Sequence, residues 1–291
     1  MEILNVFETT PWLFYTAVTV LGLCVGSFLN VVIYRLPAMM ERDWRMQCHE
    51  YLELGDAGID EKLQQLSLAK PRSACPHCGH KIRAWENIPV LSYVFLKGKC
   101  SSCGVAISPR YPIIELITGL LSVVVALQFG VSLETLFGLI LTWTLIALTV
   151  IDYDKQLLPD DLTLPLLWFG LLISFFGVFT DIQSSLIGAM LGYMILWTVY
   201  QLFKIVTGKE GMGFGDFKLL AALGAWLGWE LLPQIILLSS VVGAVTGIVM
   251  LITGATKRQQ PIPFGPYLAV AGWIALMWGH DINRLYLSSL Q

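Results

Sequence analysis

Long apolar stretches separated by short polar segments dominate the chain. A helix that crosses a membrane needs roughly 20 mostly apolar residues. Eight stretches approach or reach this length: 12–34, 112–129, 134–151, 162–180, 184–206, 217–229, 232–254 and 264–280. The sixth is short, since it is bounded by Lys218 and Glu230, so we expect it to be tilted, broken or shielded by its neighbours. The pattern predicts an all-α polytopic membrane protein with about eight transmembrane helices.

Composition supports this fold class. The 291 residues are 56% hydrophobic and only 13% charged, and the mean hydropathy is +0.68. A soluble protein of this size would not leave so little polar surface. We therefore expect membrane lipid to surround the chain, and we expect no nucleic-acid partner.

The basic residues indicate how the spans are oriented. If residues 35–111 form a cytoplasmic loop and eight spans alternate from there, seventeen of the 18 lysines and arginines lie at the cytoplasmic face. Only Arg284 lies outside. This asymmetry follows the positive-inside rule, and it supports a crossing by the short sixth span, because otherwise Lys257 and Arg258 would lie outside.

The same alternation predicts the domain organisation. We expect a first transmembrane helix at 1–34, a cytoplasmic domain at 35–111 and a seven-helix membrane core at 112–291. Residues 41–69 are charged and loosely helix-patterned. Residues 88–96 are apolar, too short to span and contain Pro89, which is typical of a strand or an interfacial segment.

Two C-x-x-C-G pairs lie in the predicted cytoplasmic loop, at Cys75/Cys78 and Cys100/Cys103. Each pair offers two thiolates on a tight turn, with a glycine after the second cysteine for the backbone turn. Four thiolates at this spacing are typical of a closed, structural zinc site. Two disulfides are the alternative, which a reducing compartment disfavours.

A glycine-rich stretch, residues 211–218, places Asp216 at the start of the short sixth span. Glycines at 211, 213 and 215 can adopt positive φ angles and allow another segment to approach closely. An ionisable group at a membrane boundary is costly unless it is hydrated or paired, so it is a candidate for function. The alternative is a loop in which Asp216 caps the next helix.

A second group of acids follows the third span at the same predicted face. Asp152 continues the apolar helix directly, whereas Asp160 and Asp161 follow Pro159 and resemble N-cap residues. Asp154 fits either description. Asp152 is the best partner for Asp216, because a negative charge at a helix C-terminus has no capping role. Two such carboxylates could share a proton as an aspartyl protease requires, one deprotonating water and the other polarising the carbonyl.

Several segments, in order along the chain, make it similar to the type IV prepilin peptidases, the bifunctional leader peptidase/N-methyltransferases of bacterial inner membranes. The segments are Gly26-Ser-Phe-Leu-Asn-Val-Val-Ile-Tyr-Arg-Leu-Pro37, both C-x-x-C pairs, Ser108 to Glu115, Asp152 to Asp160, Gly213-Phe-Gly-Asp216 and Pro263-Phe-Gly-Pro-Tyr267. The G-x-G-D motif alone is shared with presenilin-like intramembrane aspartyl proteases.

The resemblance implies that Asp152 and Asp216 are the catalytic pair, in a multi-pass enzyme whose active site faces the cytoplasm. It implies a prepilin or pseudopilin precursor as substrate, serving a pilus or a secretion system. A short basic leader would be cut after a glycine, before a residue that is usually Phe. The new amine would then be methylated from S-adenosylmethionine. No glycine-rich fingerprint marks a site for that methyl donor; Lys97, Gly98 and Lys99 are candidates by position, although turn and surface roles explain them equally.

Two other classes of protein remain open from the residues alone. A transporter could use paired acids and a glycine-broken helix for proton or cation coupling. That class predicts acids near the bilayer midplane and gives no role to the cysteines. A non-enzymatic assembly protein of a secretion system would tolerate Asp216→Asn.

Overall fold

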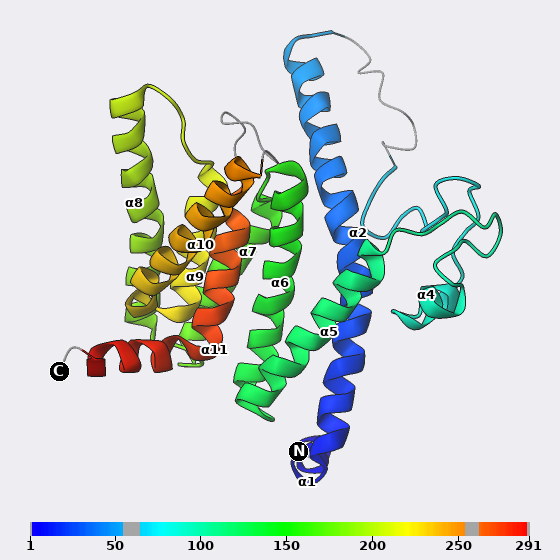
Figure 1. The fold of residues 1–291 in the computed structure, drawn as a ribbon, viewed down its shortest axis with the longest axis horizontal. Helices are drawn as coiled ribbons and strands as arrows, with labels where there is room; N and C mark the ends of the chain where they lie inside the picture. The colour runs from blue at the N-terminus through cyan, green and yellow to red at the C-terminus, as the bar shows by residue number, and fades with distance from the viewer. Residues whose placement is uncertain (1, 55–64, 254–261, 290–291) are drawn as a thin grey trace. The chain divides into compact units, whose positions relative to one another are not determined.

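The computed structural model describes residues 2–54, 65–253 and 262–289, which are mostly helical (Figure 1). Two isolated β-bridges occur in these ranges, but no strand does. The chain divides into two compact units, residues 1–135 and 136–291. The all-α fold predicted from the hydrophobic pattern is confirmed.

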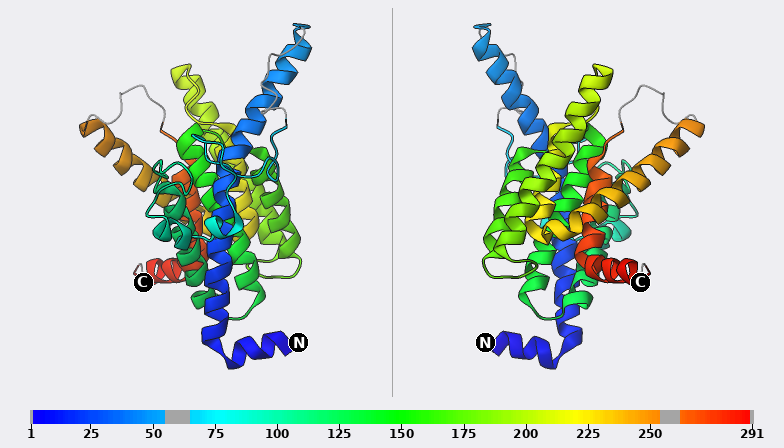
Figure 2. Two further views of the ribbon diagram at one scale, coloured as in Figure 1. Left: turned by 90° about the vertical axis from the view of Figure 1, so that its right-hand side faces the viewer. Right: turned by 90° about the vertical axis from the view of Figure 1, so that its left-hand side faces the viewer.

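The first unit is built on two long helices, α2 (Pro11–Tyr51) and α5 (Arg110–Phe129), which pack along each other. A short helix, α1 (Glu2–Thr9), precedes them and turns away from α2 (Figure 2). Glycines on α2 allow the close contact, since a Cβ atom at Gly22 would meet Ser122 and one at Gly26 would meet Glu115. Small residues at helix contacts are the usual means of packing between membrane helices.

Helix α2 extends well beyond the predicted span of 12–34. It continues to Tyr51 and contains Pro37 in its interior. Tertiary contacts support the extension: Arg35 is only 8% exposed, and its guanidinium donates to the carbonyl oxygens of Ser67 (2.9 Å) and Pro71 (2.8 Å). The middle of the predicted 41–69 helical segment, residues 55–64, lies outside the described residues.

A strand was one of the two structures predicted for residues 88–96, and it does not form. These residues follow η1 (Ala84–Asn87) and include α4 (Leu91–Phe95). The turn into α4 is held by Glu115 of α5, whose carboxylate accepts the backbone N–H of Val90 at 2.7 Å.

The second unit surrounds one short helix with longer ones. Its elements are α6 (Leu133–Lys155), which begins just before the unit boundary, α7 (Asp160–Ser174), α8 (Ile182–Thr207), α9 (Phe214–Leu227), η2 (Trp229–Leu231), α10 (Leu232–Ile252) and α11 (Gly265–Ser289). Helix α9 contacts α7, α8, α10 and α11 (Figures 1 and 2). Every residue from Asp216 to Leu227 is buried except Lys218. The predicted sixth span is therefore shielded by its neighbours.

Glycines bring α8 and α9 into backbone contact. Gly188 and Gly192 lie four residues apart on α8, as in the small-xxx-small pattern of membrane helix pairs. A Cβ atom at Gly188 would collide with the carbonyl oxygen of Gly224, and one at Gly192 would lie 2.5 Å from the carbonyl oxygen of Leu220. Ser185 adds a buried hydrogen bond to the Ala225 carbonyl oxygen at 2.5 Å. Even a methyl group would force these helices apart.

Five segments of the described residues are long and apolar enough to cross a membrane, which makes this a multi-pass membrane protein. They are Pro11–Tyr51, Arg110–Phe129, Leu133–Lys155, Ile182–Thr207 and Trp229–Ile252. The remaining three predicted spans correspond to α7, α9 and α11, which are helical as expected. Two of these three, α7 with 15 residues and α9 with 14, are shorter than the others.

Candidate active site and metal centre

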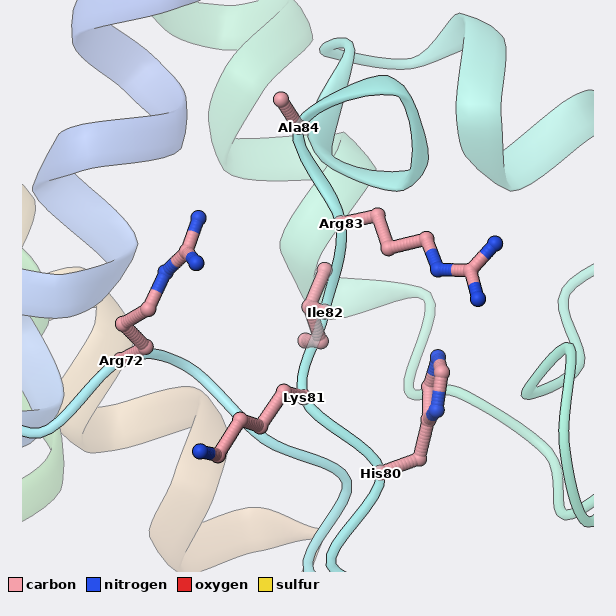
Figure 3. Close-up of a pocket in the computed structure, with 6 residues that line it drawn as sticks. All are labelled: Arg72, His80, Lys81, Ile82, Arg83 and Ala84. Atoms are coloured by element: carbon pink, nitrogen blue, oxygen red, sulfur yellow. The ribbon is translucent and has the colours of Figure 1, made fainter.

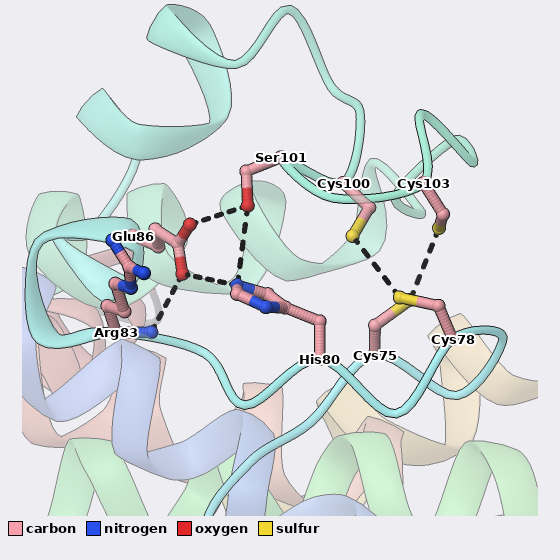
Figure 4. Close-up of polar contacts among 8 residues, drawn as sticks. All are labelled: Cys75, Cys78, His80, Arg83, Glu86, Cys100, Ser101 and Cys103. Atoms are coloured by element: carbon pink, nitrogen blue, oxygen red, sulfur yellow. Dashed lines mark hydrogen bonds and ion pairs between the residues drawn. The ribbon is translucent and has the colours of Figure 1, made fainter.

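The four predicted metal ligands come together in the first unit. Their sulfur atoms, on Cys75, Cys78, Cys100 and Cys103, all lie within 4.8 Å of one another. Sγ of Cys75 is 3.9 Å from Sγ of Cys103, and Sγ of Cys78 is 4.0 Å from Sγ of Cys100 (Figure 4). All four are free thiols, and these separations are about twice the length of a disulfide bond, ~2.05 Å.

Both C-x-x-C-G segments fold into the same turn. In the first, Gly79 N–H donates to the Cys75 carbonyl and Cys75 N–H donates to the His80 carbonyl. In the second, Gly104 and Cys100 make the equivalent bonds. Gly79 and Gly104 each have φ of +71°, a left-handed conformation that favours glycine. The expected role of these glycines is confirmed.

The spacing of the sulfur atoms suits a tetrahedral metal ion. With Zn–S bonds of about 2.3 Å, the edge of a ZnS₄ tetrahedron is roughly 3.8 Å, close to the sulfur separations of 3.9 and 4.0 Å. Two turns of identical geometry therefore present their thiols to one point, and all four coordination positions are filled by protein. Such a closed site is typical of a structural metal.

A polar cluster beside the cysteines links the two turns (Figure 4). Glu86, whose side chain is only 5% exposed, accepts hydrogen bonds from the backbone N–H of Arg83 (2.8 Å) and the hydroxyl of Ser101 (2.5 Å). Its other contact is the ring of His80 at 3.2 Å. The N–H of Arg83, the Ser101 hydroxyl and His80 together lower the pKa of Glu86 to about 2. His80 follows the first turn and Ser101 lies in the second, so one carboxylate connects them.

Gly98 lies in a turn. Its φ is +66°, and its backbone bonds to Tyr93 and Ile107. The turn interpretation of this residue is supported.

In the second unit, Asp152 lies near the end of α6 and is 5% exposed. Its Oδ2 accepts the backbone N–H of Gly265 at 3.0 Å. Gly265 is the first residue of α11, so the carboxylate faces the N-terminal end of a helix, where the peptide dipoles favour a negative charge. This contact, contributed by a segment more than 100 residues away, gives Asp152 a defined position.

Asp216 lies in the first turn of α9 and is 7% exposed. The N-cap of α9 is Gly213 and no side chain caps it, so Asp216 is not the N-cap that the alternative interpretation required. Its carboxylate does interact with the backbone of Gly213. Its second oxygen, Oδ1, is buried and has no hydrogen-bond partner among the described residues. A buried acceptor of this kind is unusual and leaves one oxygen available for another molecule.

The two buried aspartates lie close enough for their charges to repel each other. Leu158 is buried in the connection between α6 and α7. It lies against the start of α9, which carries Asp216, and against the start of α11, which binds Asp152. A Cβ atom at Gly215 would lie 2.7 Å from its Cβ, and one at Gly265 would lie 3.1 Å from its Cδ1. Gly215 thus provides the predicted close approach. Gly211, Gly213 and Gly215 do not use the positive φ that the sequence allowed, and Gly215 already lies within α9.

The other acids of the cluster are exposed. Asp154, Asp160 and Asp161 lie at the surface, and Asp160 pairs with Lys218 at 2.7 Å. The prediction that Asp160 and Asp161 are N-cap residues is wrong, because the N-cap of α7 is Pro159 and both acids are already within the helix. Burial therefore separates Asp152 from its acidic neighbours.

Sequence reasoning missed two contributors to the site, Gly265 and Leu158. The Pro263–Tyr267 motif contributed only to the family resemblance. The signal that could have found Gly265 is its place directly before Pro266 at the start of an apolar helix, where free N–H groups point outward. Nothing in the sequence distinguishes Leu158 from its neighbour Leu157.

These features define a multi-pass membrane protein with a pair of buried aspartates and a separate four-cysteine centre. The family model described as "Bacterial Peptidase A24 N-terminal domain" matches residues 20–129. The family model described as "Type IV leader peptidase family" matches residues 139–248. The chain belongs to the type IV leader peptidase family.

Similar proteins match almost end to end, and each is named "Prepilin leader peptidase/N-methyltransferase". That of Stutzerimonas stutzeri is 58% identical over 279 residues, covering 96% of both chains. That of Pseudomonas aeruginosa is 55% identical over 287 residues, covering 99% of this chain and 98% of the relative. That of Aeromonas hydrophila is 54% identical over 287 residues, with the same coverage. No solved structure matches significantly. The transporter alternative finds no support among these relatives.

Proposed function

We propose that this protein is a prepilin leader peptidase/N-methyltransferase in which Asp152 and Asp216 cut the peptide bond. The assignment rests on the observation that only some of the acids near the site are buried. Of the acids near this site, these two are buried and interact electrostatically, while Asp154, Asp160 and Asp161 are exposed. An aspartyl mechanism needs two carboxylates that can share one proton, and family membership agrees with that chemistry.

The surroundings of the two carboxylates suit different roles. Asp152 accepts a backbone N–H at the start of α11, which favours its charged form. Asp216 has a buried oxygen with no partner in the described part of the chain, where a proton or a water molecule would be accommodated. In this scheme, Asp152 removes a proton from the attacking water while protonated Asp216 donates to the carbonyl oxygen of the scissile bond.

The substrate follows from the resemblance and from the position of the site. A precursor with a short basic leader and a following hydrophobic helix would place its scissile bond near the membrane boundary, where α6 ends and α9 begins. The exposed Asp154 and Asp161 could attract the basic leader.

The second reaction methylates the new amine, and S-adenosylmethionine supplies the methyl group. We propose that the four cysteines bind zinc in a structural site, which requires a reducing compartment. We infer that residues 35–111 and the aspartates lie at the cytoplasmic face of a bacterial inner membrane, which the positive-inside pattern and the resemblance support. The domain boundaries at 34/35 and 111/112 remain part of this proposal.

The experiment that tests the catalytic assignment is cleavage of a prepilin-like precursor by the purified enzyme in detergent. Asp152→Asn and Asp216→Asn keep size and polarity but cannot share a proton, so each should lower the cleavage rate by roughly 10²–10⁴-fold. Asp154→Asn is the matched control, since it removes an exposed charge two residues from Asp152. If both buried variants fold and cut at the wild-type rate, the assignment is wrong; if Asp154→Asn alone loses cleavage, the pair is misassigned.

A further inference from the structure

Residues 65–109 of the first unit carry a strong excess of positive charge. Six basic residues occur in this range, namely Lys70, Arg72, Lys81, Arg83, Lys97 and Lys99. Glu86 is the only acid, and its carboxylate is already hydrogen bonded to Arg83 N–H and Ser101. Even with two formal negative charges from a Zn–thiolate centre, the segment stays cationic.

The same segment exposes large apolar side chains beside those charges. Trp85 and Leu91 are each 55% exposed, Val94 is 65% exposed and Phe95 is 81% exposed. They belong to η1 and α4, which lie outside the five segments able to span a membrane. Apolar side chains gathered next to basic ones are typical of a segment that lies in the membrane interface.

Two hydrogen-bonded anchors hold this segment against the ends of the spans. Arg35 directly follows the apolar run of α2, and its guanidinium holds the carbonyls of Ser67 and Pro71. Glu115 lies in the second turn of α5, and its carboxylate holds the N–H of Val90. Arg35 follows the apolar stretch 12–34, and Glu115 lies near the start of the apolar helix Arg110–Phe129, so the segment between the anchors would lie near the level of lipid headgroups.

A basic cavity opens at that level. It has a volume of about 480 Å³ and is lined by Arg72, His80, Lys81, Ile82, Arg83 and Ala84. Arg72 follows directly after Pro71, which is held by Arg35. Figure 3 shows the side chains of Arg72 and Lys81 on one side of the 80–84 segment, and those of Arg83 and His80 on the other. The cavity lining contains no acid, so its chemistry suits an anion such as a phosphate.

We propose that residues 65–109 form a docking surface for an anionic phospholipid. The exposed side chains of Trp85, Leu91, Val94 and Phe95 enter the boundary between headgroups and acyl chains. Arg72 and Lys81, whose side chains lie on the same side of the 80–84 segment, bind the headgroup phosphate. The metal centre would then be fixed to the bilayer surface as well as to the helices α2 and α5, and this docking does not depend on the peptidase reaction.

Charge and polarity favour a lipid over other partners. The proposed leader peptide is basic and would be repelled by this surface. A soluble anion would account for the cavity but not for Trp85 and Phe95 beside it. An anionic lipid satisfies both, and each basic residue at a membrane surface strengthens binding to anionic lipid by about 1 kcal/mol, roughly a fivefold change in affinity.

The test uses the full chain in nanodiscs of phosphatidylcholine, with or without phosphatidylglycerol, and two readouts. Hydrogen–deuterium exchange of residues 84–96 should be slower when phosphatidylglycerol is present. Native mass spectrometry should show tightly retained phosphatidylglycerol, and the Arg72→Gln/Lys81→Gln double variant should weaken that retention roughly 25-fold, fivefold for each residue. The matched control is Arg45→Gln, which removes an exposed arginine of α2 that pairs with Glu41.

A second variant separates the apolar contribution from the charge. Phe95→Ser should speed exchange of residues 84–96 in both kinds of nanodisc while leaving the bound metal in place. The proposal is overturned if exchange is equal in both lipid compositions, or if the double variant retains phosphatidylglycerol as well as Arg45→Gln does. It is also overturned if glycerol 3-phosphate alone, added to the enzyme in detergent, gives the full protection, because the ligand would then be a soluble anion.

Discussion

The contact between α8 and α9 leads to the sharpest prediction, Gly192→Ala. The added methyl carbon would lie 2.5 Å from the carbonyl oxygen of Leu220 and 3.0 Å from Cα of Ala221. Both are backbone atoms, so no rotamer change can relieve the clash and the helices must separate. Overpacking of this kind costs about 1–3 kcal/mol. The better helix propensity of alanine offsets less than about 1 kcal/mol of that cost.

Separation of the helices also moves Asp216, which lies one turn before Leu220 on α9. A displacement of about 1 Å can lower a catalytic rate by roughly 10²-fold. We therefore expect Gly192→Ala to reduce precursor cleavage by one to two orders of magnitude and to lower the temperature at which the detergent-solubilised protein aggregates on size-exclusion chromatography.

The matched control for this prediction is Gly247→Ala in α10. There the nearest atom to an added Cβ is the terminal Cδ1 of Ile262, at 3.3 Å, and a flexible side-chain end can move. This variant should cleave the precursor normally. If Gly192→Ala matches Gly247→Ala in both rate and thermal behaviour, the idea that backbone contact with α8 positions Asp216 is refuted.

Three further predictions concern single contacts. Glu86→Ala should raise the rate of zinc loss to a chelator roughly tenfold, since removing a partner near a metal site commonly costs 10–100-fold in affinity. Trp226→Phe should destabilise the fold by about 1–3 kcal/mol, measured by SDS-induced unfolding, because the buried indole N–H donates to the Leu166 carbonyl oxygen at 2.8 Å. Arg35→Met should accelerate amide exchange at residues 67–71 by at least roughly tenfold, because charged hydrogen bonds contribute about 1.5–3 kcal/mol each.

Each of these has a control of the same kind. Glu50→Ala removes an exposed acid of α2, and zinc loss as fast as in Glu86→Ala would contradict the role of Glu86. Trp168→Phe changes a tryptophan that is 67% exposed and should leave unfolding unchanged. Arg45→Met should not alter exchange at residues 67–71; an equal effect there would mean that the guanidinium of Arg35 does not hold that segment.

Structural features that depend only on residues close together in sequence could be predicted. The helices could be predicted from the apolar stretches. The four-cysteine cluster could be predicted from the spacing of the cysteines, because each C-x-x-C-G turn is formed by residues that are adjacent in sequence. Asp152 also stood out locally, as the acid nearest to an apolar run. Its burial beside Asp216 agrees with that interpretation.

Features that depend on contacts between residues far apart in sequence could not be predicted. The contact of Glu115, which lies beyond the first turn of α5 and accepts the backbone N–H of Val90, could not be predicted from its neighbours in sequence. The end of α2 could not be predicted from hydrophobicity, since Arg35 is accommodated by carbonyl groups from residues 67–71. Asp160 and Asp161 resembled caps by their place after Pro159, and only the helix geometry shows that they lie inside α7.

The hydrogen bond between Asp152 and Gly265 has a consequence for biosynthesis. The two residues are separated by 113 positions, and the helix that carries Asp216 lies between them. While a ribosome is still translating the middle of the chain, Asp152 lacks the N–H group that fixes it in the finished protein. On the catalytic role proposed for Asp152, the site would therefore stay incomplete during synthesis until α11 has been made and has reached Asp152.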